Sequence, residues 1–170
     1  MANPQKQKGD RAEREAVEAL VAMSSGLALT PLQMRALGAG RKEDTGDVHV
    51  FPDVAIQVKN YAAARMNQAL REAAVGAVRQ ASNGLLPFHL GMSVIPRARK
   101  GGLRWAASAV SWVVNVEPET TVANPVQALD LVKKSPLSLI LVQRKGTEDI
   151  LVSSLERWID DYRVAKSLGL

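Results

Sequence analysis

The chain contains no cysteine, which excludes disulfide bonds, thiolate zinc sites and cysteine nucleophiles. Any metal bound by this protein would therefore be held mostly by oxygen ligands. Aromatic residues make up only 4% of the 170 residues, whereas hydrophobic residues make up 46%. This composition favours a core of small aliphatic side chains, with helices packed closely on a sheet, as in α/β proteins.

Long apolar runs are also missing. No uninterrupted apolar segment approaches the ~20 residues that a membrane-spanning helix needs, and the N-terminal segment MANPQKQKGDRAERE has no apolar stretch of a signal peptide. We therefore expect a soluble, intracellular protein of the cytoplasm. A length of 170 residues suits one core, so we expect a single domain over residues 1–170, with its core at 6–116 and a C-terminal extension at 117–170.

Positive charge exceeds negative charge, since 22 Lys and Arg residues and 17 Asp and Glu residues leave a net charge of +5. Such a surface suits a polyanionic partner. The densest basic segment is IPRARKGGLR, residues 95–104, a glycine-containing loop able to approach phosphates. We expect nucleic-acid contacts from Arg97, Arg99, Lys100 and Arg104. The pairs Lys133-Lys134 and Arg144-Lys145 are explained equally well as solvated surface.

Apolar periodicity and turn residues divide the chain into alternating helices and strands. The pattern predicts helices at 8–24, 61–82, 125–133 and 150–164. It predicts strands at 27–29, 47–50, 54–59, 90–95 and 137–143, and a strand or strand pair at 105–116. Thr30-Pro31 is expected to open a short helical turn, with a loop at 39–47. The order α, β, β, β, α, β, β, α, β, α predicts an α/β protein with a mixed sheet flanked by helices.

Residues 44–60, DTGDVHVFPDVAIQVKN, place polar side chains where an apolar strand ends. Because side chains alternate along a strand, Gln57 and Lys59 share one face and Val58 points to the other. A hairpin turning at Phe51-Pro52-Asp53 would return Asp47 to the side of Gln57 and Lys59.

This arrangement would gather oxygen ligands. The Asp47 carboxylate, the Gln57 amide oxygen and the Val58 backbone carbonyl suit Mg²⁺ or Mn²⁺. Lys59 would orient or deprotonate a water, or stabilise the added negative charge of a pentacovalent phosphate. The pattern therefore predicts a metal-dependent phosphodiesterase.

Two motifs resemble a known superfamily. Gly46-Asp47, a spacer and then Gln57-Val58-Lys59 resemble the PD-(D/E)XK nuclease core in its QXK variant, as in Mrr-like endonucleases. Residues 8–15, KGDRAERE, resemble the KGxxxER signature of archaeal-type Holliday junction resolvases of the same superfamily. The resemblance covers residues 6–97 and implies a restriction-endonuclease-like fold.

The resemblance also implies roles for residues. Asp47 would be the principal metal ligand, Gln57 would replace an acidic ligand, and Lys59 would be the catalytic lysine. Glu13 would join the metal site directly or through water. Because Gln57 is neutral, we expect weaker metal binding unless Glu13 or Asp53 supplies the missing charge.

The implied activity is Mg²⁺-dependent hydrolysis of phosphodiester bonds in branched DNA such as a Holliday junction, which leaves a 5′-phosphate and a 3′-hydroxyl. A resolvase cuts two symmetric strands, so a homodimer is expected. Lys8, Arg14 and Asn60 stand in or beside the matched motifs and are further expected DNA contacts.

Alternative functions remain open at this stage. One is a restriction or repair nuclease that cuts duplex DNA, and another is an inactive DNA-binding module, which the neutral Gln57 favours. A ribonuclease is disfavoured because the interleaved aromatic residues of RNA-binding proteins are missing.

Alternative assignments also remain for single residues. Glu15 is the alternative to Glu13 as a ligand, and Glu13, Glu15 and Glu18 also fit a solvated helix face. Asp53 fits a turn. We interpret two groups as structural: the histidines His49 and His89, and the tryptophans Trp105, Trp112 and Trp158.

Overall fold

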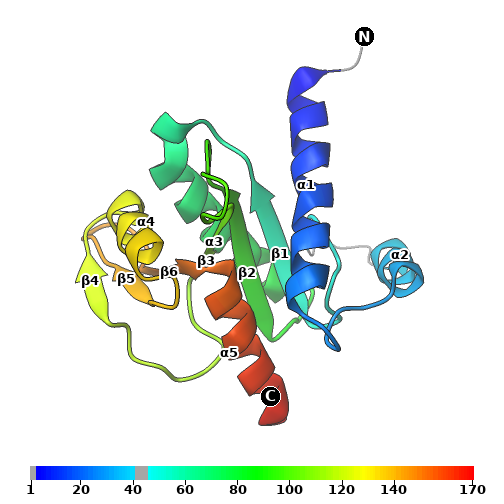
Figure 1. Ribbon diagram of the computed structural model, residues 1–170. Helices are drawn as coiled ribbons and strands as arrows, with labels where there is room; N and C mark the ends of the chain where they lie inside the picture. Colours follow the sequence, from blue (N-terminus) through cyan, green and yellow to red (C-terminus); the bar gives the residue numbers. More distant parts are fainter. Residues whose placement is uncertain (1–2, 41–45) are drawn as a thin grey trace.

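Six strands form one mixed sheet in the order β1-β2-β3-β6-β5-β4 (Figure 1). The computed structural model describes residues 3–40 and 46–170. The strands are β1 Val54–Lys59, β2 Phe88–Val94, β3 Trp105–Ala109, β4 Thr120–Val122, β5 Ile140–Val142 and β6 Ile150–Ser154. Two neighbouring pairs, β1 with β2 and β4 with β5, are parallel, and the other pairs are antiparallel. The expected α/β class with a mixed, helix-flanked sheet is confirmed.

Helices flank both faces of this sheet. They are α1 Pro4–Met23, α2 Pro31–Gly40, α3 Met66–Asn83, α4 Pro125–Lys134 and α5 Leu155–Ser167, with a short 3-10 helix, η1, at Ala63–Arg65. Side-chain caps define several starts: Asn124 and Gln127 form a reciprocal capping box at α4, and the Ser154 side chain accepts from the Arg157 N–H at α5. Each cap satisfies a backbone donor that has no partner within its own helix.

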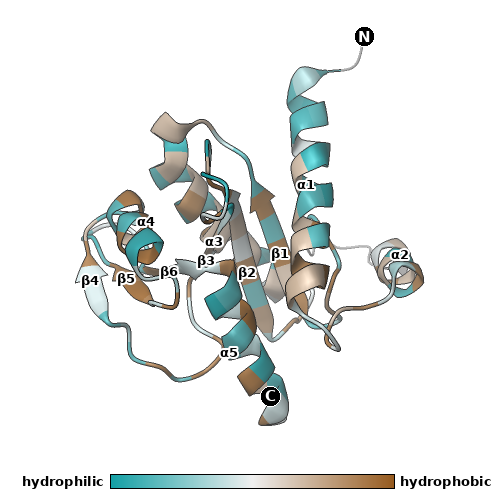
Figure 2. Ribbon diagram, viewed as in Figure 1, coloured by the Kyte–Doolittle hydropathy of each residue, from teal (hydrophilic) through white to brown (hydrophobic). Residues whose placement is uncertain are grey.

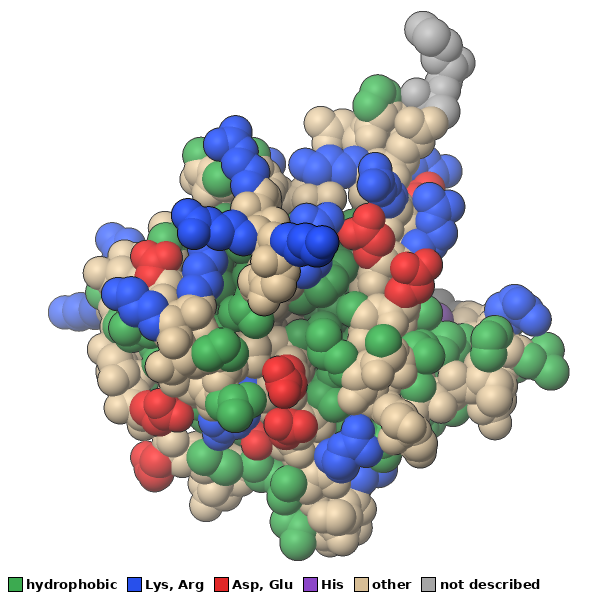
Figure 3. Space-filling view, viewed as in Figure 1, with side chains coloured by type: hydrophobic (Ala, Val, Ile, Leu, Met, Phe, Trp, Pro, Cys, Tyr) green, Lys and Arg blue, Asp and Glu red, His purple; other side chains and the backbone are tan. Residues whose placement is uncertain are grey.

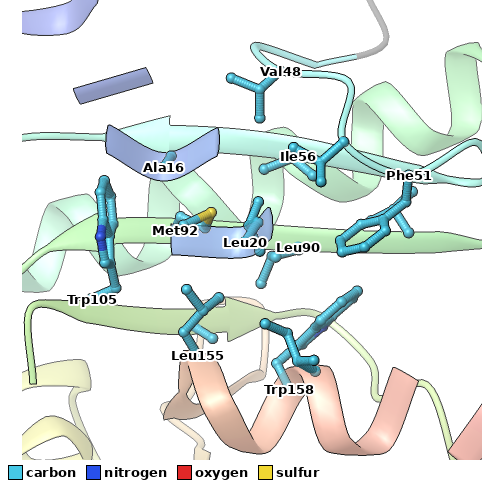
Figure 4. Packing of buried hydrophobic residues seen from close by; sticks show 14 of the residues in the cluster. Ala16, Leu20, Val48, Phe51, Ile56, Leu90, Met92, Trp105, Leu155 and Trp158 are labelled. Carbon is cyan, nitrogen blue, oxygen red and sulfur yellow. The ribbon is translucent and has the colours of Figure 1, made fainter. Parts of the chain in front are cut away.

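The core lies in two layers, one on each side of the sheet. On one face, α1 and α5 pack on β1, β2 and β3, and Figure 4 shows Leu20 of α1 beside Leu90 and Met92 of β2, with Leu155 and Trp158 of α5 in the same layer. On the other face, α3 and α4 cover the sheet. Figure 2 shows the apolar strands between these helices, while the first turns of α1, which rise past the sheet, are hydrophilic.

Helix α3 approaches β2 very closely. A Cβ added at Gly91 would lie 2.6 Å from both the Ala73 carbonyl carbon and the Ser108 Oγ, so only glycine fits there. The buried face of α3 is built mainly from alanines at positions 69, 73, 74, 77 and 81, with Gly76 among them. These small residues bring α3 down onto β1 and β2, where the polar end of β1 lies.

Only the second strand of the expected hairpin forms. Residues 54–59 form β1, but residues 47–50 form no strand and keep only an isolated antiparallel bridge from Val48 to Ile56. Val48, Val50 and Phe51 are buried in the core, and the Val50 carbonyl accepts from the Leu29 N–H at 2.8 Å instead of from a partner strand. The principal partner of β1 is instead the parallel strand β2.

Other boundaries also differ from the expectation. Residues 150–164 do not form one helix, because Ile150–Ser154 are β6 and α5 begins only after the Ser154 cap. Residues 27–29 form no strand, the strand at 105–116 ends at Ala109, and β4 was not expected. The helical turn at Thr30-Pro31 extends into the whole of α2. Most of the loop expected at 39–47 lies outside the described residues.

The region predicted as a C-terminal extension contributes three strands to the same sheet, since β6 pairs directly with β3. Among the helices of residues 3–40 and 46–170, none combines the length and the apolar character that crossing a bilayer requires.

Candidate active site

Asp47 is attached to β1 by its backbone and by its side chain. Its N–H donates to the Ile56 carbonyl at 2.7 Å. One carboxylate oxygen, Oδ2, accepts from the Gln57 side-chain amide at 2.7 Å and from the Val58 N–H at 2.8 Å. The predicted proximity of Asp47 and Gln57 is therefore confirmed, although a single bridge, rather than a paired strand, produces it.

Gly46 makes this close approach possible. Its φ is +123°, and an added Cβ would lie 2.7 Å from the Ile56 carbonyl oxygen and 2.8 Å from the Ile56 nitrogen. Any other residue would be strained by that φ and would clash with the β1 backbone. The dipeptide Gly46-Asp47 thus has a physical reason: the glycine lets the carboxylate reach the strand.

The same polar face of β1 opens into a hollow of about 620 Å³, which we call the β1–α3 hollow. Its lining includes Asp47, Gln57 and Lys59 together with Arg71, Glu72, Val75, Gly76, Arg79 and Gln80 of α3. Val58 packs in the core on the opposite face of the sheet. The predicted alternation of side chains along β1 is confirmed.

Gly76 leaves room for the Gln57 side chain. A Cβ on Gly76 would lie 3.3 Å from Gln57 Oε1 and 3.4 Å from its Cγ. The amide nitrogen of Gln57 faces Asp47 while its oxygen faces α3, so in this orientation Gln57 holds the carboxylate of Asp47. Rotating the amide by half a turn would direct its oxygen toward Asp47 and make it available to a shared cation.

Glu13 approaches Asp47 from α1. Burial raises the pKa of Glu13, and the negative charges of Asp47 and then Asp10 raise it further. Glu13 and Asp47 both line a second hollow, of about 640 Å³, between α1, α2 and the segment at Val48. Two carboxylates that destabilise each other's charge form a place where a cation would be stabilised.

The oxygen atoms around Asp47 suit a hard cation, although few of them carry a negative charge. Within residues 3–40 and 46–170, no three Asp, Glu or His side chains gather closely enough to hold a metal ion by themselves. Mg²⁺ binds proteins through one or two carboxylates and keeps several waters, a requirement that Glu13 and Asp47 meet. The residues therefore fit Mg²⁺ with Glu13 and Asp47 as ligands and with neutral oxygens, from Gln57 or the Val58 carbonyl, as further donors.

Glu15 has other partners. Its carboxylate receives Arg11 Nε at 3.2 Å and Arg104 at 3.1 Å, and the hydrogen bond from Arg104 is the main cause that lowers its pKa. It lines neither hollow that contains Asp47. Glu18 is exposed. Of the three α1 glutamates, Glu13 is the one that lines a hollow with Asp47, and the charge of Asp47 helps to raise its pKa.

Asp53 lies at the opposite end of β1 and binds helix α5. It accepts from the Tyr162 hydroxyl at 2.6 Å and from Lys166 Nζ at 2.7 Å. This carboxylate connects the start of β1 to α5, and the structure places it outside the lining of the β1–α3 hollow. The Pro52-Asp53 pair is thus a structural feature of the turn.

The residues expected to bind nucleic acid fall into two groups. Lys8, Arg14, Asn60 and Arg104 line one hollow between α1 and the end of β1. Arg97 and Arg99 line another with Lys133 of α4, and Lys100 is exposed in the same loop. Figure 3 shows Lys and Arg side chains gathered over the first half of α1, the start of α3 and the β2–β3 loop.

Helix α3 contributes a carboxylate to the β1–α3 hollow that the sequence pattern did not predict. Glu72 lines the β1–α3 hollow and accepts hydrogen bonds from the Tyr61 hydroxyl and from Gln68 Nε2. These bonds lower the pKa of Glu72, and the positive charges of Lys59 and Arg65 lower it further against the effect of burial. The available signal was the polar stripe Arg65, Gln68, Glu72 and Arg79, whose helical spacing is also that of a solvated face.

His89 and the tryptophans have structural surroundings, whereas His49 lines the hollow that Glu13 and Asp47 share. His89 is buried, its Nε2 accepts from the Val110 N–H at 3.1 Å, and burial lowers its pKa to about 4. Trp105 and Trp158 are buried, and the half-buried Trp112 donates its indole N–H to Asp161. The interpretation of these tryptophans as structural residues agrees with their burial.

No protein-family model, no curated protein and no solved structure matches this chain. The proposed function therefore rests on the residues of the β1–α3 hollow and on Glu13.

Proposed function

We propose that this chain is a Mg²⁺-dependent endodeoxyribonuclease of PD-(D/E)XK type that cleaves branched DNA, as a Holliday junction resolvase does. The observation that carries the proposal is the pair of hydrogen bonds that Asp47 accepts from Gln57 and Val58. They bring a carboxylate into the same hollow as Lys59. Glu13 of the KGxxxER-like segment is coupled to the same carboxylate. The proximity of these two motifs, which are distant in the sequence, supports the proposal.

The order of elements supports the proposed restriction-endonuclease-like fold. The strand with the QXK motif, β1, is followed by α3 and then by β2, which lies parallel beside β1. Glu13 of α1 lines a hollow together with Asp47. On this proposal the protein acts inside the cell, on DNA in the cytoplasm, as a homodimer that cuts two strands.

The chemistry is hydrolysis of a phosphodiester. Bound Mg²⁺ would supply positive charge to the phosphate oxygens and lower the pKa of a coordinated water. Glu13 and Asp47 would hold it, and Gln57 would fix Asp47 through its amide N–H. The water oxygen forms a bond to phosphorus, the P–O3′ bond breaks, and the proton lost by the water is balanced by protonation of the 3′-oxygen.

Lys59 would act on the negative charge that develops on the phosphate during the reaction. Its ammonium lines the hollow beside Asp47 and near the Glu72 carboxylate. A fixed positive charge at that position stabilises the extra negative charge of the five-coordinate phosphate and orients the attacking water. The products are a 5′-phosphate and a 3′-hydroxyl.

The test is cleavage of a labelled four-way junction with and without Mg²⁺. Asp47→Asn and Lys59→Ala should each lower the cleavage rate by at least about a hundredfold, while Lys145→Ala, in the exposed turn after β5, should cleave like the unmodified protein. Equal cleavage of linear duplex and junction at the same enzyme concentration would replace the resolvase proposal with a duplex nuclease.

A second candidate is a DNA-binding module without nuclease activity. Gln57 favours it, because a neutral amide that donates to Asp47 stands where most of the superfamily has a second carboxylate. Binding of junctions without Mg²⁺-dependent cleavage of any DNA would establish this candidate and exclude the enzyme.

A further inference from the structure

A further hollow, distinct from the one that Glu13 and Asp47 line, shares Lys59 with the β1–α3 hollow. It has a volume of about 360 Å³ and lies between the first turns of α1 and the chain that leaves β1. We call it the Tyr61 hollow; its lining residues are Gln5, Lys8, Gly9, Val58, Lys59, Asn60, Tyr61, Ala62 and Arg65. Because Lys59 lines both, whatever occupies the Tyr61 hollow is an immediate neighbour of the proposed reaction centre.

The two hollows differ in charge. Asp47 and Glu72 line the β1–α3 hollow, whereas among the described residues no Asp or Glu lines the Tyr61 hollow. Three cations, Lys8, Lys59 and Arg65, surround it instead, together with the side-chain amides of Gln5 and Asn60. Such a set of donors without acceptor carboxylates recognises an anion of phosphate type.

Arg65 is held in place by its neighbours. Its guanidinium carbon lies 4.2 Å from the centre of the Tyr61 ring, and its Nε donates to Gln68 Oε1 at 3.1 Å. The Tyr61 hydroxyl in turn donates to Glu72, which also accepts from Gln68. A cation fixed by stacking and hydrogen bonds has already lost much of its side-chain entropy, so binding an anion costs less.

We propose that the Tyr61 hollow binds a backbone phosphate of the DNA strand next to the phosphate that is cleaved, with Lys8, Asn60 and Arg65 as its principal contacts. The inference rests on the proposed function for the identity of the strand. It assigns the first two turns of α1 and the short helix η1 to the same stretch of DNA backbone. Arg65 and Tyr61 thereby become part of the substrate site.

Binding without cleavage tests this site. The affinity for a fluorescent four-way junction is measured in EDTA, so that no phosphodiester is hydrolysed. Arg65→Ala and Lys8→Ala should each raise Kd about five- to tenfold and lower the slope of log Kd against log salt by about 0.9. The matched control is Arg144→Ala, which removes the same charge from the exposed turn between β5 and β6 and should change Kd less than about twofold.

The outcomes separate this inference from the proposed function. If Arg65→Ala and Lys8→Ala bind no worse than Arg144→Ala, the phosphate site is wrong even where the protein cleaves junctions. If both variants lose affinity in EDTA but the unmodified protein never cleaves DNA with Mg²⁺, the phosphate site stands and the nuclease proposal fails.

Discussion

One oxygen of the Asp47 carboxylate accepts a 2.7 Å hydrogen bond from the amide of Gln57, so the neutral residue of the QXK motif anchors the acidic one. In a DXK or EXK site that position holds a second carboxylate, which would repel Asp47. The amide removes this repulsion and replaces it with a bond.

Gln57→Glu should therefore make the protein dependent on metal for stability. Without divalent cations, the second carboxylate loses the bond to Asp47 and repels it, and we expect a loss of about 1–3 kcal/mol in the free energy of unfolding. Thermal unfolding in EDTA and in Mg²⁺ measures this. Magnesium should raise the Tm of Gln57→Glu more than that of the unmodified protein, and equal Mg²⁺ shifts in both proteins would contradict the proposed metal site.

Glu72→Gln should slow cleavage with little change in DNA affinity. Glutamine still accepts the hydrogen bond from Tyr61, but without the negative charge of Glu72 the Lys59 ammonium is held less firmly beside Asp47, which slows the chemical step. We expect a roughly tenfold fall in kcat and less than a twofold change in the Kd for junctions. Glu148→Gln, in the exposed loop before β6, is the control. A fall in affinity with unchanged kcat would show that Glu72 acts on binding instead.

Asp53→Ala should destabilise the protein and leave the chemistry intact. The Tyr162 hydroxyl is buried and donates to Asp53, and without that acceptor we expect a loss of about 2–3 kcal/mol in chemical denaturation. The cleavage rate per folded molecule should match that of the unmodified protein below the unfolding transition. Loss of cleavage in a fully folded sample would place Asp53 in the catalytic machinery.

Stability should fall as the pH drops from 6.5 to about 4. His89 has its usual pKa of 6.5 in the unfolded chain, while burial lowers it to about 4 in the folded protein. The unfolded state therefore binds a proton first, and the contribution of neutral His89 is complete above pH 6.5 and is lost through this window, by about 3 kcal/mol.

Urea unfolding at a series of pH values measures that slope. His89→Asn, which can keep an acceptor for the Val110 N–H without a titrating ring, should flatten the slope between pH 6.5 and 4. An unchanged slope in His89→Asn would mean that other groups cause the acid sensitivity.

The part of the candidate site around Asp47, Gln57 and Lys59 was predictable because these residues are close in the sequence. Alternation along a strand placed Gln57 and Lys59 on one face, and any tight return of the chain brings Asp47 to them. The detail was wrong, since Gly46 and one bridge at Val48 replace the expected strand. The proximity of Glu13 to Asp47 was predicted from the KGxxxER-like motif alone. Local spacing could not predict it, because it depends on the packing of α1 on β1.

Two features that the sequence did not predict, the place of Glu72 and the boundary between β6 and α5, have physical causes. Glu72 reaches the site only through the packing of α3 on β1, a long-range contact that helical spacing does not encode. Residues 150–152 carry apolar side chains that suit a helix or a strand equally well, and Ser154 is the local signal that separates β6 from α5.

The alanine and glycine face of α3 has a consequence for how this site tolerates change. Ala73, Gly76 and Ala77 are buried against the sheet, and such side chains have no rotamers to exchange. A larger residue at Ala73 cannot be accommodated by local repacking and must lift the whole helix, with Glu72 and its hydrogen bonds. Substitutions that never touch DNA should thus impair folding and catalysis together, because the floor of the site has no internal freedom to absorb them.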